Sequence, residues 1–159
     1  MNEQDFVIKN KKIQKYVGNG GDVVIPDGVT ASGKEAFMEC VALTGVIIPN
    51  SVTSIGNFAF YGCKALTNVT IPNGVTSIGG CAFYYCQSLT SITIPDSVTE
   101  IGECAFSSCT SLASINIPNS VTKIGERTFK GCGKLIITTP AGSYAEEYAK
   151  KKRIKVNLI

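Results

Sequence analysis

Cysteine is the residue type in this sequence whose spacing could most readily support chemistry. Metal sites usually pair their ligands as C-x-x-C or combine them with histidine, and disulfide frameworks use even sets at irregular spacings. Neither pattern is present, so we expect no metal and no cofactor. One thiol per repeat instead predicts an inward column of small apolar side chains, because free cysteine is among the most buried residue types. Five of the seven cysteines keep an interval of 23 residues: Cys40, Cys63, Cys86, Cys109 and Cys132.

Cys81 and Cys104 form a second pair at the same interval. Other repeats have Glu35, Phe58 or Arg127 at this position, and this variability indicates partial exposure. Stacked chains about 5 Å apart would bring the two Cα atoms within disulfide range. Side chains stacked in parallel rarely reach the required dihedral, so we expect two free thiols, with a bridge as the open alternative.

The remaining polar residues do not predict an enzyme. There is no histidine, and the acidic residues are scattered without a repeated pair, so no base or nucleophile pair is apparent. Basic residues gather at the two ends and leave the repeats nearly neutral, whereas a nucleic-acid binder needs a basic face. Nine of the 15 lie there: Lys9, Lys11, Lys12, Lys15, Lys150, Lys151, Lys152, Arg153 and Lys155.

The elements that hold these residues follow one period. Such regular recurrence predicts a solenoid, in which each repeat packs only on its neighbours. Four residue types recur every 23 positions: Pro26, Pro49, Pro72, Pro95 and Pro118; Phe37, Phe60, Phe83, Phe106 and Phe129; Gly33, Gly56, Gly79, Gly102 and Gly125; Leu43, Leu66, Leu89, Leu112 and Leu135.

Residues 89–112 show the expected course of one coil. Alternation over 89–94 predicts a strand that is buried on one side and ends at Pro95. Residues 96–101 predict a short extended segment, and Gly102 predicts a corner. Apolar residues spaced by one, three and three over 105–112 predict one or two turns of helix with the apolar side inward.

Both ends depart from the period and predict caps. Residues 1–20 read as a hairpin that turns at Asn10 and Lys11, which would cover the open apolar end of the first coil. Residues 21–140 form the solenoid. Residues 141–159 predict a helix with Ser143 as N-cap and Glu146 three residues on, followed by a closing strand.

The repeat also resembles a known family. Leu-x-x-Ile-x-Ile-Pro, as in residues 89–95, together with Val-Thr-x-Ile-Gly and Ala-Phe-x-x-Cys, is similar to the BspA-like leucine-rich repeats over roughly Val23 to Pro140. The resemblance implies an α/β repeat fold, a right-handed leucine-rich-repeat solenoid of about five coils with a parallel sheet on one face. It also implies a role in protein recognition or adhesion, often on bacterial cell surfaces or in secreted proteins.

Outward positions of the predicted strands form the candidate binding face for a protein partner. The open alternatives are a purely structural spacer or assembly block and, with less support because tryptophan is lacking, a carbohydrate-binding module. Ile47 is the candidate apolar anchor, and a tyrosine group near the predicted helix is a second patch. The candidate face comprises Ile47, Asn68, Thr70, Ser91, Thr93, Ser114 and Asn116, and the second patch comprises Tyr61, Tyr84 and Tyr85.

The N-terminal residues bear on the cellular location of the protein. The charged start shows no apolar core of signal-peptide length, and no apolar run reaches the length that spans a bilayer. As written, the sequence therefore predicts a cytoplasmic protein without membrane insertion; secretion or surface display is the alternative if an export signal has been removed. No feature indicates an oligomeric state.

Overall fold

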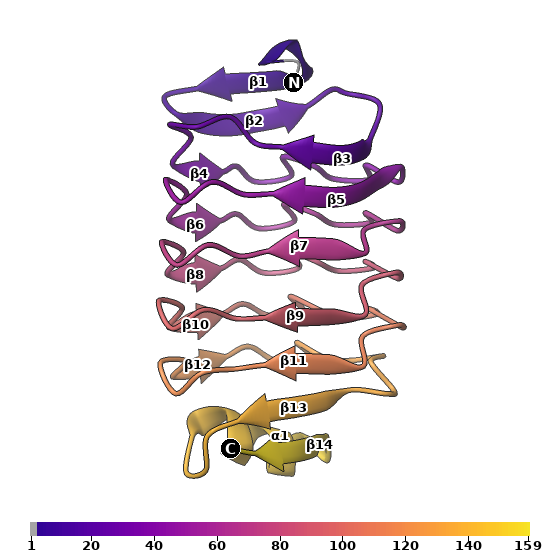
Figure 1. Ribbon diagram of the computed structural model, residues 1–159. Helices are drawn as coiled ribbons and strands as arrows, with labels where there is room; N and C mark the ends of the chain where they lie inside the picture. The colour runs from indigo at the N-terminus through magenta and orange to yellow at the C-terminus, as the bar shows by residue number, and fades with distance from the viewer. Residues whose placement is uncertain (1–2) are drawn as a thin grey trace.

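The chain winds into a stack of coils, each of which contributes one strand to a front layer and one to a back layer (Figure 1). The computed structural model describes residues 3–159. The front strands run parallel in two sheets, β3-β5-β7 and β9-β11-β13-β14, and the back sheet has the order β1-β2-β4-β6-β8-β10-β12. The front strands are β3 (Gly21–Val24), β5 (Leu43–Ile47), β7 (Asn68–Thr70), β9 (Ser91–Thr93), β11 (Ser114–Asn116), β13 (Ile136–Thr139) and β14 (Lys155–Leu158).

The predicted solenoid is therefore confirmed, with parallel strands on two sides of the coil. Six front strands lie between Gly21 and Thr139, one more than the number of coils expected, because the irregular last repeat also forms a strand. The segments expected only to be extended pair into a ladder of two-residue strands. These back strands are β4 (Ala31–Ser32), β6 (Ser54–Ile55), β8 (Ser77–Ile78), β10 (Glu100–Ile101) and β12 (Lys123–Ile124).

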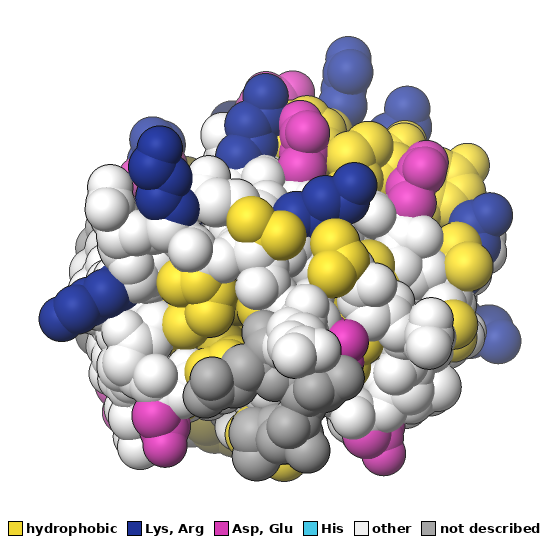
Figure 2. Space-filling view, turned by 90° about the horizontal axis from the view of Figure 1, so that it is seen from above, with side chains coloured by type: hydrophobic (Ala, Val, Ile, Leu, Met, Phe, Trp, Pro, Cys, Tyr) yellow, Lys and Arg dark blue, Asp and Glu magenta, His cyan; other side chains and the backbone are white. Residues whose placement is uncertain are grey.

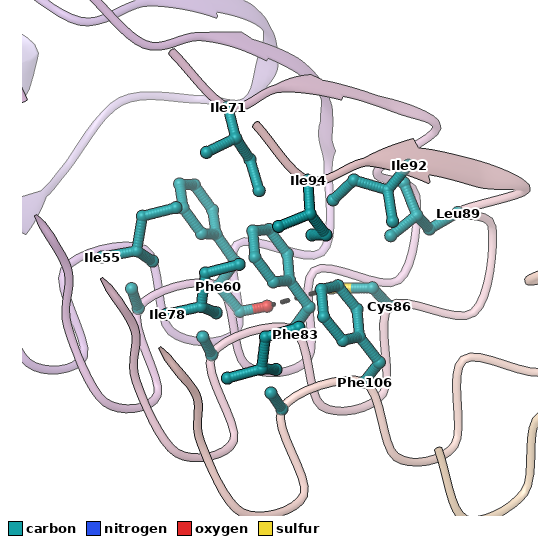
Figure 3. Close-up of a cluster of buried hydrophobic side chains, with 14 of the residues drawn as sticks. Ile55, Phe60, Ile71, Ile78, Phe83, Cys86, Leu89, Ile92, Ile94 and Phe106 are labelled. Atoms are coloured by element: carbon teal, nitrogen blue, oxygen red, sulfur yellow. Dashed lines mark hydrogen bonds between the residues drawn. The ribbon is translucent and has the colours of Figure 1, made fainter. Parts of the chain in front are cut away.

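Columns of identical side chains fill the space between front and back strands. Phe60, Phe83 and Phe106 are fully buried, and their rings stack at centroid distances of 5.2 Å with interplanar angles of 6° and 3°. Ile92 points inward from the front strand and Ile101 from the back strand (Figure 3 shows the neighbouring columns). The inward positions predicted from the period of the sequence are confirmed.

The predicted helical turns are wrong. Residues 79–88 form consecutive tight turns, and Cys81 and Tyr85 have φ values of +53° and +63°, which a right-handed helix does not allow. Successive backbone N–H groups of this segment donate in turn to an acceptor in the same coil and to one in the next coil. Ala82 N–H donates to Gly79 O at 3.3 Å, and Phe83 N–H donates to Ala105 O at 2.8 Å. Stacking thus supplies the acceptors that a helix would supply internally, while the three-residue spacing of inward side chains is the same.

An antiparallel hairpin closes the N-terminal end. It consists of β1 (Phe6–Lys9) and β2 (Lys12–Tyr16), preceded by a short 3-10 helix (Glu3–Asp5), and Asn10 and Lys11 turn the chain at φ values of +51° and +59°. Strand β2 then pairs in parallel with β4, so the hairpin continues the back sheet. Figure 2 looks onto this end and shows basic side chains projecting around its rim.

A helix and a strand close the C-terminal end. Helix α1 (Tyr144–Lys152) begins at Ser143, whose Oγ accepts a hydrogen bond from Glu146 N–H at 3.1 Å. The Glu146 carboxylate accepts from Gly142 N–H at 2.6 Å, one residue earlier than in a standard capping box, and pairs with Lys150. Both partners hold the pKa of Glu146 below its usual value, Lys150 having the larger effect. Strand β14 then pairs in parallel with β13.

Candidate functional site

The cysteine column lies inside the solenoid except at its N-terminal end, where Cys40 is only half-buried, contrary to the prediction. Each buried thiol donates to the carbonyl oxygen of a phenylalanine in the preceding coil, as Cys86 Sγ does to Phe60 O at 3.2 Å (Figure 3). The equivalent distances for Cys63, Cys109 and Cys132 are 3.1, 3.0 and 3.1 Å. Burial raises the pKa of Cys63 to about 12 and that of Cys132 to about 11, and it also raises the pKa values of Cys86 and Cys109. These thiols therefore stay protonated and act as hydrogen-bonded core residues.

Cys81 and Cys104 lie at the outer turn, half-buried and free. Burial is the main cause that raises the pKa of Cys81, followed by its neighbour Cys104. The expectation of two free thiols agrees with this arrangement. Within residues 3–159 no group of three or more His, Cys, Asp or Glu side chains could hold a metal ion.

Thiol labelling should separate the two kinds of cysteine. At pH 9 under native conditions, iodoacetamide should modify Cys81, Cys104 and the half-buried Cys40, while the four buried thiols remain unmodified. Burial keeps the reagent away from these four side chains, and because the thiolate is the reactive form, their raised pKa values also leave them largely protonated at this pH. Burial also raises the pKa values of Cys40 and Cys81, but these thiols are only half-buried, so the reagent can still reach them. Mass spectrometry of proteolytic fragments measures this, with urea-unfolded protein as the control that labels all seven cysteines. Rapid native labelling of Cys86 or Cys109 would contradict the buried column.

The candidate binding residues do share one surface. Within each of the two front sheets the strands run in register, so that Gly45 pairs with Asn68, Ser91 with Ser114, and Thr93 with Asn116. Except for Gly45, these side chains are exposed, whereas the residues between them point into the core. We call this surface the front face: Ile47, Asn68, Thr70, Ser91, Thr93, Ser114 and Asn116.

Ile47 is the exposed apolar residue of the front face. Its side chain is 61% exposed, although the paired position on the next coil carries Thr70 and the equivalent position one repeat further carries Thr93. On its other side it pairs with the partly exposed Val24, which the sequence analysis did not select. Among the front strands, charge occurs only at Asp22 near one end and Lys155 at the other.

The tyrosine patch lies on the turn segments. Tyr61 and Tyr84 stack at 5.2 Å and 3°, and Tyr85 tilts against Tyr84 at 5.0 Å and 44°. A shallow cleft of about 510 Å³ adjoins the patch and includes Lys64 among its lining residues. The predicted tyrosines are therefore brought together, but on a different segment of the coil from the front face.

Sequence reasoning missed a break in the front layer. Strands β7 and β9 belong to different sheets, and a groove of about 380 Å³ opens between them. The repeats on either side share almost the same residue pattern, so no sequence signal marks this position. Val69, Asn73 and Pro95 join the front-face residues as part of its lining.

Stacked coils with a parallel front layer define a leucine-rich-repeat solenoid, and comparison with known proteins identifies its family. The model of the BspA-type leucine-rich repeat region matches residues 22–149 with six copies, and the chain belongs to this family. Such repeats commonly mediate protein interactions, and the fold is typically non-catalytic. No helix in the described part of the chain has the length and apolar character needed to cross a membrane.

Solved structures of bacterial proteins are similar to this chain. A leucine-rich repeat protein of T. pallidum is 37% identical with a TM-score of 0.82, over 87% of this chain and 70% of that one. One from Bacteroides ovatus is 33% identical with a TM-score of 0.68, over 87% of this chain and 42% of that one. A leucine-rich cell surface protein of Faecalibacterium prausnitzii is 29% identical with a TM-score of 0.53, over 84% of this chain and 52% of that one. The chain thus spans less than two thirds of the latter two. No curated protein matches it.

Proposed function

We propose that this chain is a non-catalytic protein-binding module that recognises its partner through the front face. The observation that carries the proposal is the placement of Ile47, 61% exposed, among small polar side chains, with Asp22 on the neighbouring strand as the one charged residue lining the cleft beside it. An exposed apolar anchor in a surface with few charges is typical of the centre of a protein interface. The fold supports this use because solenoids present extended surfaces along their stacked strands.

The exposed side chain at Ile47 is not required by the fold. Position 47 corresponds to Thr70, Thr93 and Asn116 in later coils, so a small polar residue satisfies the same strand position. An isoleucine there exposes apolar area to water without adding to the core. A partner surface that covers Ile47 and Val24 would recover the free energy of burying that area, roughly 25 cal/mol per Å².

We further propose an adhesion-type role on a bacterial cell surface. The similarity to a leucine-rich cell surface protein of F. prausnitzii supports this proposal. The competing proposal is a cytoplasmic interaction or assembly role. Fractionation of producing cells with an antibody against the solenoid separates the two: surface accessibility on intact cells supports adhesion, and protection until lysis supports the cytoplasmic role.

Charged substitutions on the front face should abolish partner capture without unfolding the protein. We expect Ile47→Glu, Asn68→Glu, Thr93→Glu and Asn116→Glu each to weaken capture of a bound partner about tenfold or more, since a buried unpaired charge costs over 1.4 kcal/mol. Melting temperatures should stay near wild type, because these side chains are exposed. Quantitative pull-down from host extract and from the producer's lysate measures the effect.

Two controls make this scan decisive. Thr122→Glu changes an exposed residue beside back strand β12 and should leave capture unchanged. Tyr61→Ala and Tyr84→Ala test the tyrosine patch. If all four front-face variants bind like wild type while the tyrosine variants do not, the partner uses the turn segments. If no partner is captured at all, the chain acts as a structural spacer.

A further inference from the structure

The first strand of the front layer carries a carboxylate beside the exposed apolar residues. On β3, which lies at the N-terminal end of the layer (Figure 1), Val23 points into the core, whereas Asp22 is exposed and Val24 is partly exposed. Val24 pairs with Ile47 of β5, and Asp22 pairs with Gly45. The outer surface of these two strands therefore has an apolar row and, two residues earlier along both strands, a charged row.

The carboxylate of Asp22 is held across Gly45. Its Oδ1 accepts a hydrogen bond from Thr44 Oγ1 at 2.8 Å, and a Cβ atom at position 45 would lie 2.6 Å from the same oxygen. Glycine therefore leaves the space that the carboxylate occupies, which places this charge at a defined point of the surface. Later coils carry side chains at the equivalent position: Asn68, Ser91, Ser114 and Ile136.

Two clefts meet at Asp22. One, of about 220 Å³, is the cleft beside Ile47. The other, of about 330 Å³, lies between β3 and the hairpin cap, and it is lined by a second carboxylate, Asp5, and by the aromatic side chains of Phe6 and Tyr16. The clefts are adjacent because three residues of β3 line both of them: Asp22, Val23 and Val24.

The two carboxylates are not balanced by nearby basic side chains. Among the salt bridges of residues 3–159, none includes Asp5 or Asp22. In the same part of the chain, no lysine or arginine lines either cleft. The clefts therefore present negative charge to whatever occupies them.

This charge restricts which partners can cover the apolar row. A partner that buries Ile47 also removes water from Asp22, because both residues line one cleft. Removing water from a carboxylate without supplying a counter-charge costs free energy, and an acidic partner would add repulsion. A cationic side chain next to the apolar one avoids this cost. The aromatic rings of Phe6 and Tyr16 also favour lysine or arginine, which they attract by cation–π interaction and contact through its methylene groups.

We propose that this surface binds an extended segment of the protein partner in which an apolar residue and an arginine or lysine stand two positions apart. The apolar side chain covers Val24 and Ile47, and the cationic side chain lies against Asp22 where the two clefts meet. Asp22 and Val24 are also two positions apart, and extended chains share a rise of roughly 3.3 Å per residue, so one register makes both contacts. The inference rests on the proposed function and names the partner chemistry that this end of the front face selects.

Peptide titration tests the charge preference. The probes are acetylated, amidated pentapeptides of sequence Thr-Leu-Thr-X-Thr, with arginine, glutamine or glutamate at X, added to the intact chain and followed by NMR. We expect saturable amide shifts at Asp22, Val24, Gly45 and Ile47 with the arginine peptide, which should bind about tenfold more tightly than the glutamate peptide. Equal affinities of the three peptides, or no shift with the arginine peptide, would overturn the proposal.

Salt separates charge recognition from apolar contact. Because Asp22 is exposed, its attraction for arginine is screened as the ionic strength rises. The arginine peptide should therefore bind several-fold more weakly in about 0.5 M than in about 0.05 M sodium chloride, whereas the affinity of the glutamine peptide should change little. An arginine-peptide affinity that does not depend on salt contradicts the proposal.

Matched variants assign the two contacts. Asp22→Asn keeps the shape of the side chain and removes its charge, and Asp96→Asn makes the same change at an exposed turn outside both clefts. The first should remove most of the preference for arginine, and the second should retain it. Ile47→Thr introduces the residue type of the paired Thr70 and should weaken binding of the arginine and glutamine peptides alike. An unchanged arginine preference in Asp22→Asn contradicts the proposal.

Partner capture distinguishes the failure of this inference from the failure of the proposed function. If capture depends on Thr93 and Asn116 while Asp22→Asn captures like wild type and the arginine and glutamine peptides bind alike, the cationic segment is wrong and the proposed function stands. If no front-face substitution changes capture, the proposed function fails, and this inference fails with it.

Discussion

Phe83→Ala should lower the free energy of unfolding by about 3–5 kcal/mol and the melting temperature by roughly 6–20 °C. Phe83 is fully buried at the middle of the aromatic column, and its ring stacks on Phe60 and Phe106 at 5.2 Å on both sides. The surrounding coils cannot collapse into the cavity, because backbone hydrogen bonds fix their spacing at both the back strands and the turns. Thermal denaturation followed by circular dichroism measures the loss.

The matched control for this change is Tyr85→Ala. Tyr85 is an exposed aromatic residue of the same turn segment, so its removal should cost about 1 kcal/mol or less. If Phe83→Ala melts within a degree or two of wild type, the inward assignment of the phenylalanine column is wrong.

Gly102→Ala should destabilise the solenoid by about 1–3 kcal/mol or more, because overpacking against backbone forces strain. A Cβ atom at position 102 would lie 2.5 Å from Gly80 N and 2.6 Å from Gly79 C in the preceding coil. Backbone atoms cannot move aside as a flexible side chain can. Chemical denaturation measures the change, and we expect a lower midpoint with an unchanged slope.

Gly133→Ala is the control for the glycine column. No atom outside its immediate chain neighbours lies within 4 Å of a Cβ atom built at this position, and its φ is not positive. The substitution should therefore be neutral or stabilise the fold by up to roughly 1 kcal/mol, through the lower entropy of the unfolded chain. Equal destabilisation by both substitutions would mean that coil spacing is not what requires Gly102.

The sequence predicted the columns of the core because the period itself carries that information. Every 23rd residue faces the same surroundings, so Phe60, Phe83 and Phe106 could be assigned to one column before any coordinates were known. The end hairpin and the C-terminal helix also followed from local signals, namely the turn at Asn10 and the N-cap at Ser143.

Local signals failed where contacts between coils decide the backbone. Spacings of three residues fit both a helix and the stacked turns of residues 79–88, and the choice depends on acceptors in the neighbouring coil. The chain does turn directly after Gly102, as expected, but its φ is not positive, and the close approach of Gly80 is what requires glycine there. The groove between β7 and β9 likewise arises from how coils are spaced, which a repeating sequence does not reveal.

Site-specific photocrosslinking tests the proposed protein-binding front face most directly. A photoreactive amino acid at Thr93 lies on front strand β9, and one at Thr122 lies beside back strand β12. Both positions are exposed, so the two proteins should fold equally well, and the two photoreactive side chains should be equally accessible to solvent. The account predicts a covalent adduct with the captured partner from position 93 and none from position 122. An adduct from position 122 alone would contradict it.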